Sequence, residues 1–304
     1  MLGSGIAGVT ASHSSPLQVP ESVLQISPDC LPFCPMASLR PCLNASTLRG
    51  TPVLDQIRAA ARAGFRALEL WYDDTDAHRR RGGSLEEIRH ALEDAGLEVP
   101  TLIYLGGWFE AQETAWPAVR DACARRLEEA AALGAAHVIA GPPVGHADVR
   151  TGALRYRELL ELGDRIGVAP AFEFLGFMEQ FRTVTSALEV IALAGHPRAA
   201  TVVDPFHLVR GGGSMDDVAR LTARQIAIAH FNDLPAGHPV ATLQDADRVW
   251  PGDGCLDLRR YRERLREVGY EGWLSLELFR EDLWRRDPFE VARIARERLE
   301  PWLD

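Results

Sequence analysis

The chain has 304 residues, of which 46% are hydrophobic and 25% are charged, and its formal net charge is −10. This composition is that of an ordinary globular protein, and the negative charge argues against nucleic-acid binding through phosphate contacts. No apolar run approaches the roughly 18 residues of a membrane-spanning helix, so we expect no membrane partner. Five scattered cysteines do not form a disulfide framework, which favours a reducing, cytoplasmic location.

The first part of the chain differs in composition from the rest. Residues 1–37 are rich in serine, proline and glycine, and we expect a disordered extension before a single domain over residues 38–304. The string GSGIAG at residues 3–8 matches a dinucleotide-binding fingerprint, but the strand before it and the long helix after it are missing. We hypothesise that Met36 is the true start of translation, which mass spectrometry of the native protein would test.

From about residue 40, short apolar runs alternate with longer segments of helical periodicity. The runs predict strands over residues 42–45, 67–71, 99–105, 137–140, 169–174, 200–204, 226–231 and 273–278. The intervening segments predict helices over residues 52–63, 84–95, 116–133, 150–166, 183–194, 214–224, 256–267 and 288–299. Ser84 and Glu87 form a capping-box pattern. Eight such units predict an α/β fold, a (β/α)8 TIM barrel, with a doubly wound open sheet as the alternative.

Ionisable side chains occupy the ends of the last four predicted strands. They are Glu173, Asp204, His230 and Glu277. In a barrel these ends meet on one side of the mouth, where barrel enzymes place their chemistry. Taken alone, each is more commonly a helix cap, an ion-paired carboxylate or a core histidine. Together they require a cation or protons, and the oxygen-rich set favours Mn²⁺, Mg²⁺ or Co²⁺, with Zn²⁺ also compatible.

The ordered motifs resemble the xylose isomerase-like TIM barrels, the sugar phosphate isomerase/epimerase superfamily. They are Glu173, DPFH at 204–207, HFND at 230–233, DRVWPGDG at 247–254 and Glu277 in SLEL, and they lie within the approximate range 40–300 over which the resemblance extends. The resemblance implies that Glu173, Asp204, His230 and Glu277 bind one divalent metal ion. It also implies that His207 and Arg248 contact the substrate.

A metal ion chelated by a carbonyl and its neighbouring hydroxyl stabilises an enediolate. The sequence therefore predicts a metal-dependent isomerase or epimerase of a sugar or sugar-like hydroxy-ketone, acting by proton transfer through a metal-bound enediolate. Glu173 and Glu277 are the expected bases, and His207 and Arg248 are expected to donate hydrogen bonds to the oxyanion. The alternative is a metal-dependent dehydratase of the 3-dehydroshikimate or inosose type, which also begins with proton removal beside a carbonyl.

Further residues near the ends of the second and third strands are predicted substrate contacts. They are Glu69, Trp71, Tyr104 and Trp108. For Trp71 and Trp108, core packing is an equally good interpretation. An endonuclease IV-like enzyme is disfavoured, because Val249 stands where a further histidine is expected. A barrel that binds a ligand without turnover is disfavoured because all four ligand residues are present. The expected partner is a small sugar-like molecule, and a homo-oligomer is compatible with the sequence.

Three other segments receive weaker predictions. Arg210–Gly213 is either a solvated turn or a mobile lid, because three glycines relax the backbone there. Asn232 and Asp233 are expected to cap or orient the loop after the seventh strand, with a supporting contact to His230 as the alternative. His78, in an arginine-rich stretch, is expected on a solvated surface loop.

Overall fold

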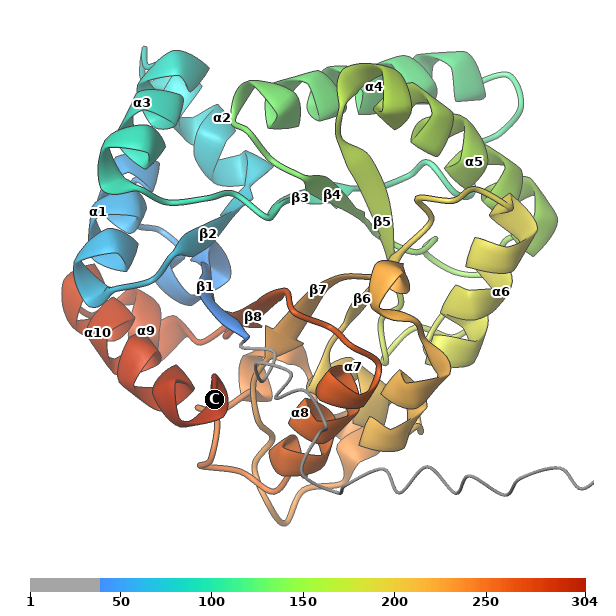
Figure 1. Cartoon of the computed structure of the whole chain (residues 1–304). Helices are drawn as coiled ribbons and strands as arrows, with labels where there is room; N and C mark the ends of the chain where they lie inside the picture. Colours follow the sequence, from blue (N-terminus) through green and yellow to red (C-terminus); the bar gives the residue numbers. More distant parts are fainter. Residues whose placement is uncertain (1–38) are drawn as a thin grey trace, which may run out of the picture. The chain divides into compact units, whose positions relative to one another are not determined.

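The structure is a computed structural model that describes residues 39–304. Parallel strands close into a barrel in sequence order, with the last strand paired to the first (Figure 1). The strands are β1 (Arg40–Asn44), β2 (Ala67–Trp71), β3 (Thr101–Leu105), β4 (His137–Ala140), β5 (Ala169–Glu173), β6 (Thr201–Val203), β7 (Ile226–Phe231) and β8 (Trp273–Leu276). The predicted TIM barrel is confirmed. The predictions of disorder over residues 1–37 and of a start at Met36 lie outside the described residues.

Helices surround the barrel and connect its strands (Figure 1). The α-helices are α1 (Val53–Ala63), α2 (Tyr72–Arg80), α3 (Leu85–Ala95), α4 (Trp116–Ala132), α5 (Val149–Ile166), α6 (Val184–Ala194), α7 (Pro205–Arg210), α8 (Leu258–Glu267), α9 (Glu281–Trp284) and α10 (Pro288–Leu299). The 3-10 helices are η1 (Ala45–Leu48), η2 (Met215–Arg220), η3 (Ala223–Gln225), η4 (Val240–Thr242), η5 (Asp245–Asp247) and η6 (Glu300–Trp302). Within residues 39–304, no helix combines the length and the apolar composition that crossing a bilayer requires.

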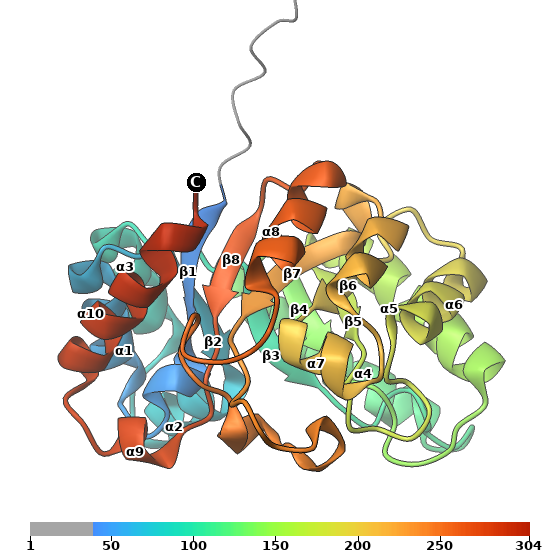
Figure 2. The ribbon, with the colours of Figure 1, turned by 90° about the horizontal axis from the view of Figure 1, so that it is seen from below.

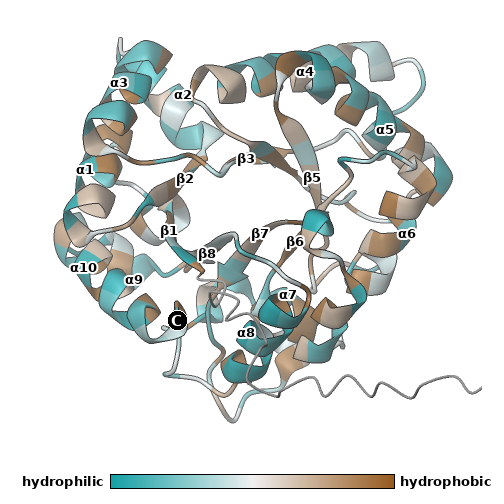
Figure 3. Ribbon diagram, in the orientation of Figure 1, coloured by the Kyte–Doolittle hydropathy of each residue, from teal (hydrophilic) through white to brown (hydrophobic). Residues whose placement is uncertain are grey.

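One apolar side chain from each strand fills the barrel interior. These residues are Cys42, Ala67, Ile103, Ile139, Ala171, Val202, Ile228 and Trp273. A larger apolar layer separates the strands from the helices, and Figure 3 shows largely hydrophobic strands inside a ring of helices of mixed hydrophilic and hydrophobic residues. Because side chains alternate along a strand, residues two positions beyond the interior layer also face the barrel axis.

Capping residues lie at the ends of the helices, close to the positions that the sequence predicts. The Ser84 hydroxyl accepts from the Glu87 N–H at 3.1 Å, and the Glu87 carboxylate accepts from the Ser84 N–H at 3.0 Å. This pair confirms the capping box at the start of α3. Gly64 and Gly96 end α1 and α3 with φ values of 86° and 64°, a conformation that only glycine adopts without strain.

The predicted helix over residues 214–224 is wrong. The segment forms two 3-10 helices, η2 and η3, with extended backbone at Leu221 and Thr222 between them. Ser214 and Thr222 each begin a capping box, so two short helices start where the apolar periodicity suggests one long helix.

The prediction that His78 lies on a loop is also wrong, because His78 belongs to helix α2. Asp73 and Asp74 occupy the first turn of this helix, and His78 and Arg79 occupy its last turn. That order of charges stabilises the helix through its dipole. Since α2 has few apolar residues, hydrophobic periodicity does not reveal it. The His78 side chain is 17% exposed and lies 2.9 Å from the Glu87 carboxylate of α3.

Trp108 lies in the apolar core and not at the barrel mouth. Its side chain is fully buried. Its ring centroid is 5.1 Å from that of Phe109, 5.8 Å from that of Tyr156 and 6.2 Å from that of Phe172. Of the two interpretations of Trp108, the structure supports core packing, and we do not retain it as a substrate contact.

We predict that Trp108→Ala lowers the free energy of unfolding by about 3–5 kcal/mol, because it leaves a cavity among large aromatic side chains. Tyr104→Ala is the control, since Tyr104 is 54% exposed and its removal should cost less than about 1 kcal/mol. Urea denaturation followed by circular dichroism measures both values. Equal losses in the two variants would contradict the core assignment.

Candidate active site

Polar side chains follow the apolar interior layer at the C-terminal ends of the strands. They are Asn44, Glu69, Glu173, Asp204, His230 and Glu277. Each lies two or four positions beyond an interior residue of the same strand, so all of them face the barrel axis. The four predicted metal ligands come from consecutive strands, and they therefore lie on one side of the mouth.

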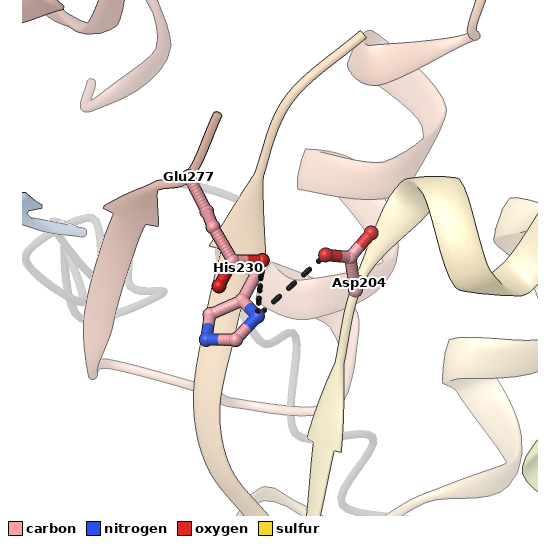
Figure 4. Close-up of side chains that lie close together, drawn as sticks. All are labelled: Asp204, His230 and Glu277. Carbon is pink, nitrogen blue, oxygen red and sulfur yellow. Dashed lines mark ion pairs between the residues drawn. The ribbon is translucent and has the colours of Figure 1, made fainter. Parts of the chain in front are cut away.

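Asp204, His230 and Glu277 form a compact group of potential metal ligands (Figure 4). One ligand atom of each residue lies within 4.8 Å of the others. His230 Nδ1 is 3.6 Å from Asp204 Oδ2 and 3.2 Å from Glu277 Oε2. Glu173 Oε1 is 3.7 Å from the same nitrogen. The three carboxylates therefore gather around His230 Nδ1, with Glu173 outside the compact group of three.

Glu69 orients His230 from the opposite side of the ring. Nε2 of His230 lies 3.3 Å from the Glu69 carboxylate, whereas Nδ1 has no hydrogen-bond partner among residues 39–304. We therefore assign the hydrogen to Nε2, which leaves the Nδ1 lone pair directed at three carboxylates. Burial alone would lower the pKa of His230, but Glu277 and Glu69 raise it well above its usual value. Nδ1 thus favours a positive partner, either a proton or a metal ion that replaces it.

Glu69 itself lies beneath the cavity and not on its wall. It is fully buried and accepts hydrogen bonds from the Thr101 and Ser275 hydroxyls and, at 3.2 Å, from the Asn44 amide. Burial alone would raise the pKa of Glu69, but His230 and the two hydroxyls lower it. The carboxylate therefore stays ionised beside the His230 ring. We interpret Glu69 as a positioning residue, and we do not retain it as a substrate contact.

Asp204 uses its two carboxylate oxygens differently. Oδ1 accepts from the N–H groups of Phe206 at 2.7 Å and His207 at 3.2 Å, and so caps helix α7. Oδ2 accepts from Arg248 at 2.9 Å and faces His230. Burial alone would raise the pKa of Asp204, but Arg248 lowers it. Helix capping and metal binding are therefore compatible, because they involve different oxygens.

Arg248 reaches the cluster from the long loop between β7 and α8. Nη1 donates to Asp204 and Glu277, and Nη2 donates to Asp245 at 2.6 Å. Burial alone would lower the pKa of Arg248, but these three carboxylates raise it. The guanidinium is 1% exposed and is a fixed positive charge that partly neutralises the cluster. It also lines the cavity described below, as a substrate contact requires.

Asp233 anchors the loop that carries Arg248. Its buried carboxylate accepts hydrogen bonds of 2.8–3.1 Å from the backbone N–H groups of Leu234, Gly252, Gly254 and Leu256. The Asp233 backbone also pairs with Val249 in both directions. A Cβ on Gly254 would lie 2.4 Å from the Asp233 carboxylate, so only glycine fits there. This is the orienting role that the sequence predicts for Asp233.

His207 presents an N–H group to the cavity. Its Nδ1 accepts from the Gly176 N–H at 3.1 Å, and burial lowers the pKa of His207 to about 4. The ring is therefore neutral, with its hydrogen on Nε2. Nε2 lies 3.2 Å from Arg248 Nη2, but two N–H groups cannot bond to each other. The Nε2–H group is thus available to an acceptor in the cavity.

A cavity of about 580 Å³ opens at this cluster. Glu173, His230 and Glu277 line it on the barrel side, and Trp71 and Tyr104 line it further out. Figure 2 shows α9 and the loop between β7 and α8 beyond the same end of the barrel. The volume suits a small-molecule ligand. Trp71 and Tyr104 are therefore placed as the predicted substrate contacts require.

The segment Arg210–Gly213 is held against the rest of the barrel. Arg210 Nε donates to the Leu243 carbonyl at 2.9 Å, and Arg182 Nε donates to the Gly211 carbonyl at 3.0 Å. A Cβ on Gly211 would lie 1.9 Å from the Arg182 carbonyl oxygen. These contacts argue against a mobile lid, and the turn that they leave is packed and not solvated at Gly211, which is buried.

Asn44 belongs to the site although it is not among the residues that the sequence predicts. Its Nδ2 donates to Glu277 Oε1 at 2.9 Å. Its Oδ1 accepts from the Trp71 indole at 2.8 Å and from the Ser46 N–H at 3.0 Å. Asparagine at the end of a strand is common because it stabilises turns. The only sequence signal was therefore its place at the end of the first strand.

The residues present fit a divalent cation. The buried Nδ1 of His230, unpartnered among the described residues, faces three carboxylates, whose mutual repulsion requires positive charge. Arg248 supplies one such charge, but within this group it donates only to Asp204 and Glu277. One imidazole nitrogen with several carboxylate oxygens is a donor set common to Mn²⁺, Co²⁺ and Zn²⁺, and its oxygens also suit Mg²⁺.

Comparisons with known proteins match most of the barrel. The family model described as xylose isomerase-like TIM barrel matches residues 57–303. An inosose isomerase of Halalkalibacterium halodurans is 26% identical over 84% of this chain and 93% of its own. A putative hydroxypyruvate isomerase of Streptomyces coelicolor is 27% identical over 74% of this chain and 85% of its own. The solved structure of the IolI protein with a zinc atom has a TM-score of 0.80 at 22% identity, over 87% of this chain and 98% of that chain.

We predict that Asp204→Asn and Glu277→Gln each lower the affinity for Mn²⁺ by more than about tenfold, because each removes a charged oxygen ligand at nearly constant size. Glu263→Gln, at a 58% exposed position on α8, is the matched control. Isothermal titration calorimetry measures the affinity, and circular dichroism verifies the fold. Wild-type affinity in both site variants would exclude the proposed metal centre.

We also predict that Glu69→Gln lowers the affinity for Mn²⁺ by about 10- to 100-fold, because a neutral amide orients His230 less well than a carboxylate. The cavity-lining residues are unchanged in this variant. Glu98→Gln, at a 68% exposed position just before β3, controls for the loss of one negative charge. If calorimetry gives the same affinity for Glu69→Gln as for the control, Glu69 does not position the ligand.

Proposed function

The chain belongs to the xylose isomerase-like TIM barrel family, and from this premise we propose that it is a divalent-metal-dependent isomerase or epimerase of a sugar or sugar-like hydroxy-ketone. The observation that carries this proposal is the buried His230 Nδ1 turned toward three carboxylates, of which Glu173 and Glu277 line the cavity. The inosose isomerase and the putative hydroxypyruvate isomerase support it, since both are named as isomerases.

The residues proposed to hold the cation are Glu173, Asp204, His230 and Glu277. When bound, the cation acts as a Lewis acid toward a substrate carbonyl and its neighbouring hydroxyl. The zinc atom in the similar IolI structure supports a metal in this fold, and the donor set described above also suits Mn²⁺, Mg²⁺ and Co²⁺.

Glu173 is the proposed proton acceptor. Its side chain lines the cavity and is 13% exposed, against 1% for Asp204 and 5% for Glu277. Burial, together with Glu277 and Asp204, raises the pKa of Glu173 to about 8. A cation in the site would lower this pKa and keep the carboxylate ionised, as a group that accepts a proton must be. Glu277 is more restrained, because Asn44 and Arg248 both donate to it.

The return of the proton decides the product. Return by Glu173 to the neighbouring carbon, with the hydroxyl proton moving to the former carbonyl oxygen, would give aldose–ketose isomerisation. Delivery of a proton to the opposite face by Glu277, which would have to enter the reaction protonated, would give epimerisation and leave the abstracted proton on Glu173. His207 is the proposed donor to the developing oxyanion through its Nε2–H group, and the fixed charge of Arg248 stabilises the same oxygen.

Trp71 and Tyr104 are proposed to contact the body of the substrate. Both line the cavity, and the bond from the Trp71 indole to Asn44 fixes the orientation of that ring. Tyr104 is 54% exposed and stands at the rim. An aromatic face of this kind packs against the C–H groups of a sugar ring while excluding water.

We predict that solvent deuterium enters the substrate at the carbon beside the carbonyl during turnover. The panel comprises ketoses, inososes, hydroxypyruvate and 3-dehydroshikimate, each with Mn²⁺, Mg²⁺, Co²⁺ and Zn²⁺. Glu173→Gln should slow this exchange by about 10²- to 10⁴-fold, because it removes the base. Proton NMR and mass spectrometry measure the exchange.

Glu179→Gln is the matched control, because Glu179 follows the same strand but its side chain is 72% exposed. It should exchange at the wild-type rate. A product without solvent label, or unchanged exchange in Glu173→Gln, would contradict the assigned proton transfer. Absorbance of protocatechuate formed from 3-dehydroshikimate would assign the dehydratase alternative in place of the isomerase.

A further inference from the structure

Arg49 places a second guanidinium at the cavity, distinct from Arg248. It follows η1 directly, is half-buried and lines the same cavity as Glu277. Its Cζ lies 5.1 Å from the ring centroid of Trp71 and 5.8 Å from that of Trp284. The two indoles therefore hold a cation whose hydrogen-bonding edge is left uncovered.

The two cavity guanidiniums differ in their partners. Arg248 donates to Asp204, Asp245 and Glu277 and is 1% exposed. Arg49 forms no ion pair with a carboxylate of residues 39–304. Its guanidinium also donates no hydrogen bond to any of these residues. Arg49 acts on the Asp74 carboxylate only through its charge: burial raises the pKa of Asp74 and Arg49 partly offsets this, without an ion pair between them. Arg248 is thus committed to the protein, whereas the donors of Arg49 are available to a ligand.

The aromatic platform under Arg49 is rigid and is tied to the metal cluster. The Trp284 indole donates to the Ser46 carbonyl at 2.8 Å, and the Trp71 indole donates to Asn44 at 2.8 Å. The same Asn44 amide donates to Glu277 Oε1 at 2.9 Å. A short chain of hydrogen bonds therefore connects the platform to a proposed metal ligand.

We propose that Arg49 forms an anion subsite, so that the preferred substrate carries a carboxylate or phosphate group on the part remote from the reacting hydroxy-ketone. This inference rests on the proposed function for the identity of the reacting group. A planar guanidinium held beside two indole rings is preorganised to donate two parallel hydrogen bonds to such an anion. The cavity of about 580 Å³ has room for a substrate with both groups.

The test compares matched neutral and anionic hydroxy-ketones. The pairs are D-fructose with D-fructuronate, and D-fructose with D-fructose 6-phosphate, in which the anion is remote from the ketone; each is bound to Mn²⁺-loaded full-length protein in calorimetry. The wild-type protein should bind the anionic member of at least one pair about 10- to 100-fold more tightly. Arg49→Met, which keeps the aliphatic stem, should abolish this preference, and Arg49→Lys should keep part of it.

Arg62→Met is the control, because Cζ of Arg62 lies 5.7 Å from the ring centroid of Phe289 and Arg62 does not line the cavity; this variant should leave the preference unchanged. The pair that shows the preference identifies the anion as carboxylate or phosphate. Equal binding of both members of each pair to the wild-type protein, or a preference that persists in Arg49→Met, overturns the subsite. A preference without any solvent exchange would support the subsite and refute the proposed isomerase.

Discussion

Repulsion among carboxylates at one end of a closed barrel is the constraint on which this site depends. Glu69, Asp204 and Glu277 are almost fully buried, and charges buried near one another destabilise a fold unless positive charge and hydrogen bonds compensate them. The Arg248 guanidinium and the surrounding hydroxyl and amide donors supply part of the compensation. The compensation of negative charge is incomplete around His230 Nδ1, which faces the carboxylates. A further positive charge would stabilise this group, and this property determines which chemistry the cavity supports.

The residues of the site come from two kinds of backbone, the ends of strands and a long loop. The strand ends fix the charged cluster through the barrel register, and Asp204 links that cluster to the first turn of α7. Arg248, in contrast, comes from a loop, and the Asp233 carboxylate holds this loop by collecting backbone N–H groups. The neighbouring Asn232 donates to both oxygens of Asp204. Strand and loop are therefore joined by side chains that do not reach the cavity themselves.

Much of this arrangement could be predicted from the sequence, because the strands read as apolar runs and their last polar residues mark one end of the barrel. The sequence alone could not distinguish residues that line the cavity from residues that also lie near a strand end but have other surroundings. Glu69 lies against His230, and Trp108 packs against Tyr156 and Phe172, and all of these neighbours are distant in sequence. Asn44 could not be identified because its partners Glu69 and Glu277 lie 25 and 233 positions away.

The double role of Asn44 bears on how the specificity of such a barrel can diverge. One amide side chain supports both the Trp71 wall and the Glu277 carboxylate, so a mutation that repacks this wall also disturbs the reactive centre. Phe177 and Met178 line the cavity from the segment after β5 and have no such bond to Asn44. New substrates are therefore more accessible to evolution through that second wall, while the first is constrained by the chemistry that it helps to support.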